Sequence, residues 1–238
     1  SRMTLGFSSP NTFGTVFFSV VLDILILLKD KKQKILWYLM LMVISIIFFK
    51  VTDSRTSIYL SIIVIVGSLL LNWLKVVKIP SLVVIGSYIG VNIINILPPL
   101  LYKPTNFFVN LNNLFSGRIA MSKYFIDTIG VHWFGSSVSE RLNNDLFYGH
   151  FIKSELWILD NGYFRILINQ GLIFFLLFLV ILYIKLYNNR NNPLLFLLFV
   201  SIFIFGIFER YAFNPLVFSL LLCDDMNEVT FKRRKNET

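Results

Sequence analysis

Apolar segments long enough to cross a lipid bilayer recur along this chain. A helix needs about 20 apolar residues to cross the hydrocarbon core, and its backbone must satisfy its own hydrogen bonds there. Six such segments are clear and a shorter seventh follows, at 12–28, 35–50, 57–74, 81–98, 166–186, 193–208 and 211–223. The alternating segments of about 10 residues that build a membrane β-barrel are absent. We therefore predict an all-α, polytopic bundle of about six to seven spans, with residues 1–238 forming a single integral membrane domain.

The composition supports a membrane protein. Hydrophobic residues make up 56% of the chain and charged residues 15%, whereas about a quarter of a soluble domain is charged. The only cysteine is Cys223, which excludes a disulfide framework and a cysteine-based metal site. The net charge of +9 comes largely from short loops and the tail, so we expect no nucleic-acid partner.

The basic loops orient the bundle, because lysine and arginine concentrate in cytoplasmic loops. The segments assigned to the cytoplasm are 29–34, 74–80, 185–192 and the tail 224–238. The alternate segments then face outward, at 1–11, 51–57, 99–165 and 209–215. The segment 99–165 is a long extracytoplasmic loop, and structureless loops of this length are uncommon and usually functional. Its amphipathic stretches 113–130 and 155–168 predict short helices at the outer interface.

Five arginines fall on the predicted outer side: Arg2, Arg55, Arg118, Arg165 and Arg210. Arginine binds phosphate in a bidentate manner and keeps its charge at every relevant pH. The alternative is that each one extends to the membrane interface for solvation. A set on the outer side runs against the usual charge bias, which favours a role in binding an anion.

The sequence has no Asp-x-Asp motif of the kind that holds a divalent ion in many glycosyltransferases. We expect no metal ion and no cofactor, so arginines would neutralise a diphosphate. Among the outward acids, Asp160 is the best placed general base, since it lies beside Asn161 at the start of a helix. Asp160 also suits the N-cap of that helix. His150 is a second candidate base, or a solvent-facing loop residue.

Two further acids have open interpretations. Asp23 lies inside the first span, where an ionisable group is functional by default, or it pairs with Asn72 or another buried polar group. Glu209 and Arg210, at the outer end of the sixth span, form either part of the site or a local ion pair.

Several of these stretches, taken in order, resemble one family. RMTLGFSSPNTFG, TDSRTSIYL, SGRIAM, WFGSS and LDNGYFRILINQGLI are similar to ordered motifs of bacterial O-antigen ligases and surface-polysaccharide polymerases of the Wzy type. The resemblance covers residues 2 to about 172. It implies joining of oligosaccharide repeat units, carried on undecaprenyl diphosphate, at the outer face of the cytoplasmic membrane. The products of such proteins are O-antigen, capsule or exopolysaccharide.

The resemblance also implies roles. Arg2, Arg55 and Arg118 would contact diphosphate, and Asp160, where ligases usually have histidine, would activate or orient the acceptor hydroxyl. Arg165, Arg210 and Asn161 are secondary candidates. The implied partners are the lipid-linked oligosaccharide, membrane lipids, a chain-length regulator and a flippase. Members of the family usually have more spans and roughly twice this length, and WFGSS lacks a second glycine, so we expect a C-terminal portion or a reduced member. The alternatives are a ligase of the same superfamily, or a transporter or flippase subunit.

Overall fold

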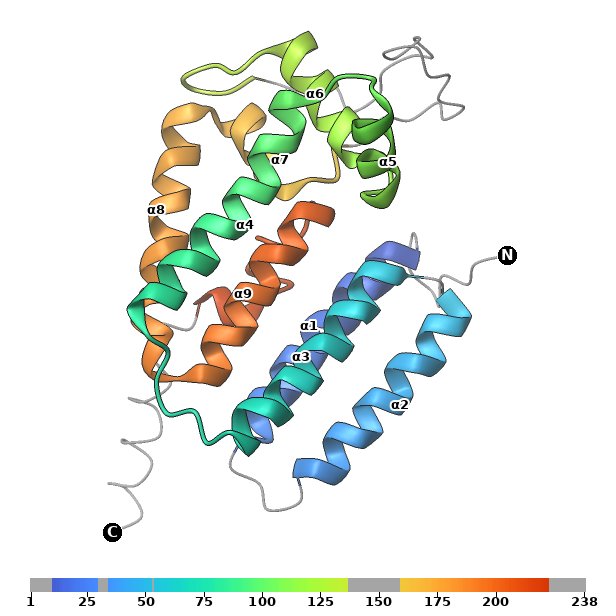
Figure 1. Ribbon diagram of the computed structural model, residues 1–238, viewed down its shortest axis with the longest axis vertical. Helices are drawn as coiled ribbons and strands as arrows, with labels where there is room; N and C mark the ends of the chain where they lie inside the picture. Colours follow the sequence, from blue (N-terminus) through green and yellow to red (C-terminus); the bar gives the residue numbers. More distant parts are fainter. Residues whose placement is uncertain (1–9, 30–33, 53, 137–158, 223–238) are drawn as a thin grey trace. The chain divides into compact units, whose positions relative to one another are not determined.

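A computed structural model describes residues 10–29, 34–52, 54–136 and 159–222 (Figure 1). These residues are helical with no strand, which confirms the predicted all-α class. The helices are α1 (Pro10–Leu27), α2 (Lys34–Thr52), α3 (Arg55–Trp73), α4 (Ser81–Leu101), α5 (Asn106–Leu114), α6 (Arg118–Ile129), α7 (Gly162–Gln170), α8 (Leu172–Asn188) and α9 (Pro193–Phe208), with short 3-10 helices η1 (Asn189–Asn191) and η2 (Ser219–Leu222).

Four helical segments are long and apolar enough to cross a membrane, namely α2, α3, α4 and α8 together with η1. Only 17% of the apolar window of α4 is buried inside the protein, and 22% of those of α2 and α8. Large exposed side chains such as Leu36, Val43 and Leu177 cover these helices. Extensive exposed apolar surface of this kind is unusual for a soluble monomer. The shorter helices α1 and α9 are also apolar.

The chain divides into two compact units. Unit 1 comprises residues 1–85, 184–205 and 211–238, and unit 2 comprises residues 86–183 and 206–210.

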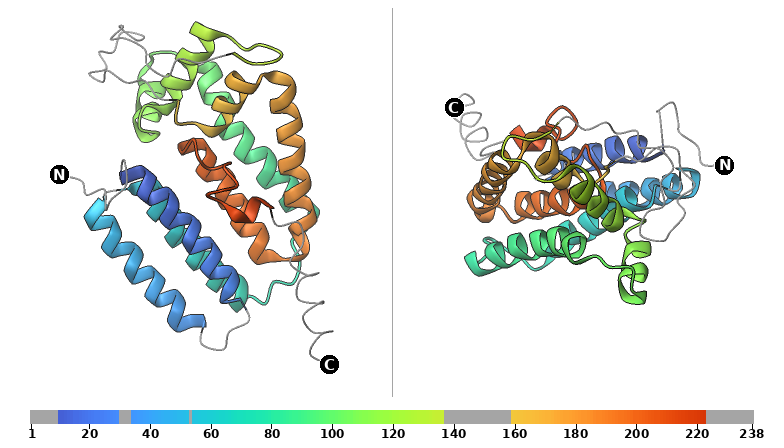
Figure 2. Two further views of the ribbon diagram at one scale, coloured as in Figure 1. Left: turned by 180° about the vertical axis from the view of Figure 1, so that it is seen from behind. Right: turned by 90° about the horizontal axis from the view of Figure 1, so that it is seen from above.

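In unit 1, α1 and α2 both pack against α3 (Figure 2). Small residues let α1 and α3 approach closely, because a Cβ added to Gly14 would collide with the hydroxyls of Ser54 and Ser57. Such small residues are common between membrane helices. Behind this seam lies an aromatic core, in which Phe18 packs on Phe205 at 4.9 Å and on Phe218 at 5.9 Å between ring centroids.

In unit 2, α4 and α8 are joined by Tyr88, whose hydroxyl donates to the Leu179 carbonyl at 2.9 Å. Helix α6 packs on α5 and on α7. Helix α6 falls within the predicted stretch 113–130, whereas α7 overlaps the stretch 155–168 only in part and extends past its end to Gln170.

Two predicted spans differ from the structure. The apolar run 166–186 is divided at Gly171, which has a φ of 90° and separates α7 from α8. The hydropathy pattern does not reveal this break, because the residues on both sides of Gly171 are apolar. Residues 211–222 form turns and η2 rather than a spanning helix, so the seventh predicted span is wrong over the described residues.

Candidate active site

Arg118 is the centre of the candidate site, and its position follows from the turn before it. Gly117 adopts a left-handed conformation with φ 84°, which a residue with a side chain rarely adopts. The Gly117 N–H donates to the Asn112 carbonyl at 2.8 Å, and the Asn112 side chain accepts from the Ala120 N–H at 2.9 Å. This turn makes Arg118 the first residue of α6.

The guanidinium of Arg118 has three partners within unit 2. Its Nε donates to the Phe208 carbonyl at 2.7 Å, and one terminal nitrogen donates to Glu209 Oε1 at 3.5 Å. The same nitrogen lies 3.9 Å from Asp160 Oδ2. The Phe208 ring also lies under the guanidinium, 5.9 Å from centroid to Cζ. Three segments far apart in the sequence therefore meet at one arginine.

The two carboxylates differ in their exposure. The side chain of Glu209 is 7% exposed, against 34% for Asp160. Burial raises the pKa of Glu209 to about 8, and this outweighs the nearby charge of Arg118, which lowers it. Asp160 raises the same pKa and Arg210 lowers it, each to a smaller extent. Near neutral pH, Glu209 is thus mainly a neutral hydrogen-bond partner, and Asp160 is the accessible carboxylate.

Asn161, not Asp160, caps α7. Its side-chain oxygen accepts from the N–H groups of Tyr163 at 3.0 Å and Phe164 at 3.2 Å. Its amide nitrogen donates to Asn95 Oδ1 of α4 at 2.7 Å, and both asparagines are buried. The predicted capping role of Asp160 is wrong, because the neighbouring amide can cap the helix and bond to α4 at the same time. Asp160 is left facing Arg118.

Two glycines bring the WFGSS and LDNGYFRILINQGLI segments together. The N–H groups of Leu172 and Ile173 donate to the carbonyls of His132 at 2.9 Å and Trp133 at 3.3 Å. A Cβ at Gly135 would overlap the backbone of Asn169, and one at Gly171 would overlap the backbone of residues 133–135. Residues 132–136 therefore supply hydrogen bonds at the start of α8 that the break at Gly171 would otherwise leave open.

The remaining predicted site residues belong to other elements or lie outside the described residues. Arg55 is exposed at the first position of α3 in unit 1. Arg165 lies on α7, one turn beyond Asn161. Arg2 and His150 lie outside the described residues. Asp23 accepts from Ser219 Oγ at 3.0 Å, whereas the predicted partner Asn72 accepts from Lys34 at 2.5 Å.

The sequence does not predict the hydrogen bond from Arg118 to Glu209, because these residues lie 91 positions apart. The sequence indicates only the neighbouring Arg210 as an ion-pair partner of Glu209. A charged pair directly after an apolar helix was the only available signal. Asn95, an amide within the fourth apolar run, was also missed. Within the described residues, no group of three or more His, Cys, Asp or Glu is placed to hold a metal ion.

Comparisons of this chain with protein-family models, with curated proteins and with solved structures find no match.

Proposed function

We propose that this chain is a membrane-embedded glycosyltransferase. More particularly, it polymerises undecaprenyl-diphosphate-linked oligosaccharide repeat units at the outer face of the bacterial cytoplasmic membrane. The observation that supports this proposal most directly is the 3.9 Å approach of Asp160 to Arg118. The family resemblance implies these two residues as acceptor-activating and diphosphate-binding groups, and they lie 42 positions apart in the sequence.

The roles in the transfer follow from exposure and charge. The partly exposed carboxylate of Asp160 takes the proton of the acceptor hydroxyl. The acceptor oxygen forms a bond to the anomeric carbon of the donor sugar, while the bond from that carbon to the diphosphate oxygen breaks. Undecaprenyl diphosphate leaves with the bonding electron pair. Arg118, whose side chain is 12% exposed, stabilises the charge that develops on the leaving group.

The hydrogen bonds of Arg118 suit this role. Its Nε–H and one terminal N–H point to Phe208 and Glu209, which fix the plane of the guanidinium. A preorganised donor needs little rearrangement during the reaction. Because Glu209 is mainly neutral near pH 7, it orients Arg118 without cancelling its charge. The family resemblance also implies contacts to diphosphate for Arg2 and Arg55.

The proposed topology follows the charge pattern. We infer that six apolar helices cross the cytoplasmic membrane: the four that have the length and composition to do so, and the shorter α1 and α9. Residues 99–165 and 209–215 face outward and carry Arg118, Asp160 and Glu209. Nucleotide sugars are not available on that side, so the donor there must be lipid-linked. A flippase would supply it, and a chain-length regulator would act on the product.

The test is polymer formation by purified protein in proteoliposomes that contain lipid-linked repeat units. We expect lipid-linked chains of increasing length from the wild type, and a loss of about 100-fold or more for Asp160→Asn. Arg118→Lys should lower the rate of elongation by a comparable factor, because an ammonium group cannot offer the planar pair of N–H donors of a guanidinium. The matched control is the double variant Lys123→Ala and Asp127→Ala, which removes a 2.8 Å ion pair from the same helix α6.

Three outcomes contradict the proposal. Normal chain lengths from both site variants would show that Asp160 and Arg118 do not have the assigned roles. Transfer of finished glycan to a separate acceptor, without elongation, would indicate a ligase. Movement of the lipid-linked unit across the bilayer without any transfer would indicate a transporter or flippase.

A further inference from the structure

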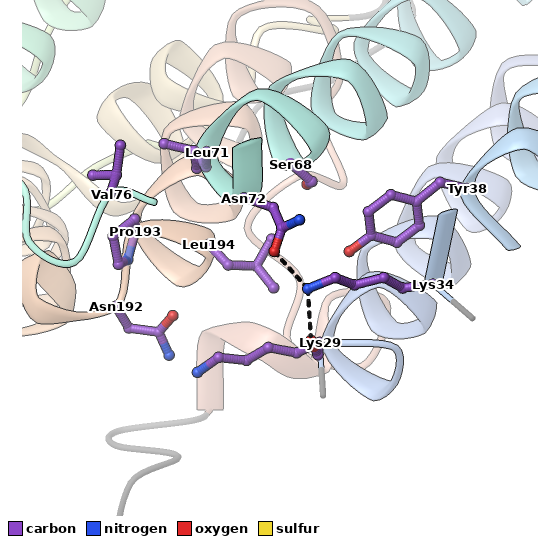
Figure 3. A pocket seen from close by; sticks show the side chains of 10 residues that line it. All are labelled: Lys29, Lys34, Tyr38, Ser68, Leu71, Asn72, Val76, Asn192, Pro193 and Leu194. Atoms are coloured by element: carbon purple, nitrogen blue, oxygen red, sulfur yellow. Dashed lines mark hydrogen bonds between the residues drawn. The ribbon is translucent and has the colours of Figure 1, made fainter. Parts of the chain in front are cut away.

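A pocket of about 280 Å³ opens in unit 1, among residues that the proposed glycosyl transfer does not use. Figure 3 shows its polar side chains, which come from the turn after α1, from α2 and α3, and from the residue just before α9. They are Lys29, Lys34, Tyr38, Ser68, Asn72 and Asn192. None of the ten lining residues is acidic. The pocket therefore combines two positive charges with several uncharged hydrogen-bonding groups.

The two lysines are not equivalent. Lys34 donates to the Asn72 side chain at 2.5 Å and to the Lys29 carbonyl at 3.5 Å. These hydrogen bonds connect the start of α2 to the turn after α1 and to the end of α3. Within the described part of the chain, the ammonium group of Lys29 makes no hydrogen bond or ion pair, and it extends toward Asn192 in Figure 3. The Lys34 ammonium group is held by these hydrogen bonds, whereas the Lys29 ammonium group is exposed and accessible to a ligand.

Helix α9 adds to the positive potential at this pocket. It begins at Pro193, and its first residues line the cavity. The N-terminal end of a helix carries partial positive charge and attracts anions. Asn192 stands just before this start, and its side-chain oxygen accepts from the Leu195 N–H at 3.5 Å. The side-chain amide nitrogen of Asn192 is thus a further donor at the pocket.

The size of the pocket limits the ligand. Pockets for drug-sized molecules measure about 300–1,000 Å³, so this one is at the lower limit. A single phosphate with a small ester group fits that volume, whereas an oligosaccharide repeat unit does not. The charge pattern also assigns the loops 29–34 and 74–80 to the cytoplasmic side, where basic pockets between membrane helices bind the head groups of anionic lipids.

We propose that this pocket binds a phosphate group through Lys29, Lys34 and the amide of Asn192. The phosphate belongs either to the head group of an anionic phospholipid or to a small soluble phosphate. This site is separate in sequence and chemistry from the glycosyl-transfer residues, so it stands whether or not the proposed function is correct.

The experiment is native mass spectrometry of the full chain released from nanodiscs of phosphatidylglycerol or of phosphatidylcholine. A parallel calorimetric titration in detergent uses inorganic phosphate and glycerol 3-phosphate. The variant is Lys29→Gln, which leaves the helix ties through Lys34 in place and so should fold normally. The matched control is the double variant Lys50→Gln and Lys103→Gln, which removes two exposed lysines outside the pocket.

We expect the wild type to retain phosphatidylglycerol over phosphatidylcholine, and Lys29→Gln to weaken that binding about fivefold. The control should bind as the wild type does. Binding of soluble phosphate without lipid retention, with the same sensitivity to Lys29→Gln, supports the soluble source. The proposal is overturned if neither form of phosphate binds the wild type, or if the control weakens binding as much as Lys29→Gln does.

Discussion

Glu209 accepts from Arg118 at 3.5 Å, with both side chains largely buried, at 7% and 12% exposure. Burial has the larger effect on this carboxyl, and its pKa rises to about 8 despite the arginine. An ion pair in water would shift it in the opposite direction. The pair is therefore a charged arginine held by a neutral acid over most of the physiological range.

The first prediction concerns stability against pH. An unfolded glutamate ionises near 4.5 and the folded one near 8, so the folded protein binds more protons between these values. Stability from this group is fully present below about pH 4.5 and is lost as the pH rises through 8. We expect the apparent Tm in detergent to fall across this window. Glu209→Gln should flatten the slope, and an unchanged slope in that variant would contradict the assignment.

The second prediction concerns activity and rests on the proposed transfer. Above pH 8 the ionised Glu209 cancels part of the charge of Arg118, so the stabilisation of diphosphate weakens. We expect the elongation rate to decline above pH 8 in the wild type. Glu209→Gln should retain its rate there, since glutamine still accepts from Arg118 without adding charge. The measurement is a pH profile of chain elongation, and coincident profiles for the two proteins would exclude this role.

How far the sequence predicted the structure depends on the residue. Apolar runs located α2, α3 and α4 within several residues, because hydropathy governs burial in a bilayer. The break at Gly171 was not predicted, since its signal is a backbone angle rather than a change in hydropathy. The charge pattern placed residues 99–165 and 209–215 on one side, a condition for contact between Arg118 and Glu209. The charge pattern does not show which side chains lie beside one another, so it could not show that Glu209 contacts Arg118.

The third prediction tests the bridge that Arg118 forms to the end of α9. In Arg118→Lys, a single ammonium group cannot keep the planar, two-point contact with the Phe208 carbonyl and Glu209. A buried acceptor left without its donor costs about 1–3 kcal/mol. We expect a lower apparent Tm and faster hydrogen exchange at Glu209 and Arg210. Lys123→Ala, on the same helix, should change stability by less than about 0.5 kcal/mol. Equal effects of the two substitutions would count against the bridge.

The fourth prediction separates the neighbours Asp160 and Asn161. Asn161→Ala removes the cap of α7 and the bond to Asn95, so it should cost about 1–3 kcal/mol. Asn161→Asp keeps the capping oxygen but loses the donor to Asn95, and should fall between that variant and the wild type. Asp160→Asn should leave the apparent Tm nearly unchanged while slowing elongation about 100-fold or more. If Asp160→Asn destabilises as much as Asn161→Ala, the loss of activity has a structural cause.

The fifth prediction concerns the junction between α7 and α8. Gly135 and Gly171 have φ values of 83° and 90°, and an added Cβ at either would overlap backbone atoms of the other segment. Backbone cannot move aside as a flexible side chain can. We therefore expect Gly135→Ala and Gly171→Ala each to cost more than about 3 kcal/mol, by the combined effect of strain and overlap.

The glycines of α4 provide the control for this junction. An added Cβ at Gly86 or Gly90 meets no atom within 4 Å, and both residues lie inside a helix. Alanine is favoured over glycine by about 0.5–1 kcal/mol in a helix interior, so Gly86→Ala and Gly90→Ala should be neutral or stabilising. The measurement is apparent Tm together with the yield of folded protein. If the junction glycines tolerate alanine as the α4 glycines do, residues 132–136 do not pack against the break at Gly171.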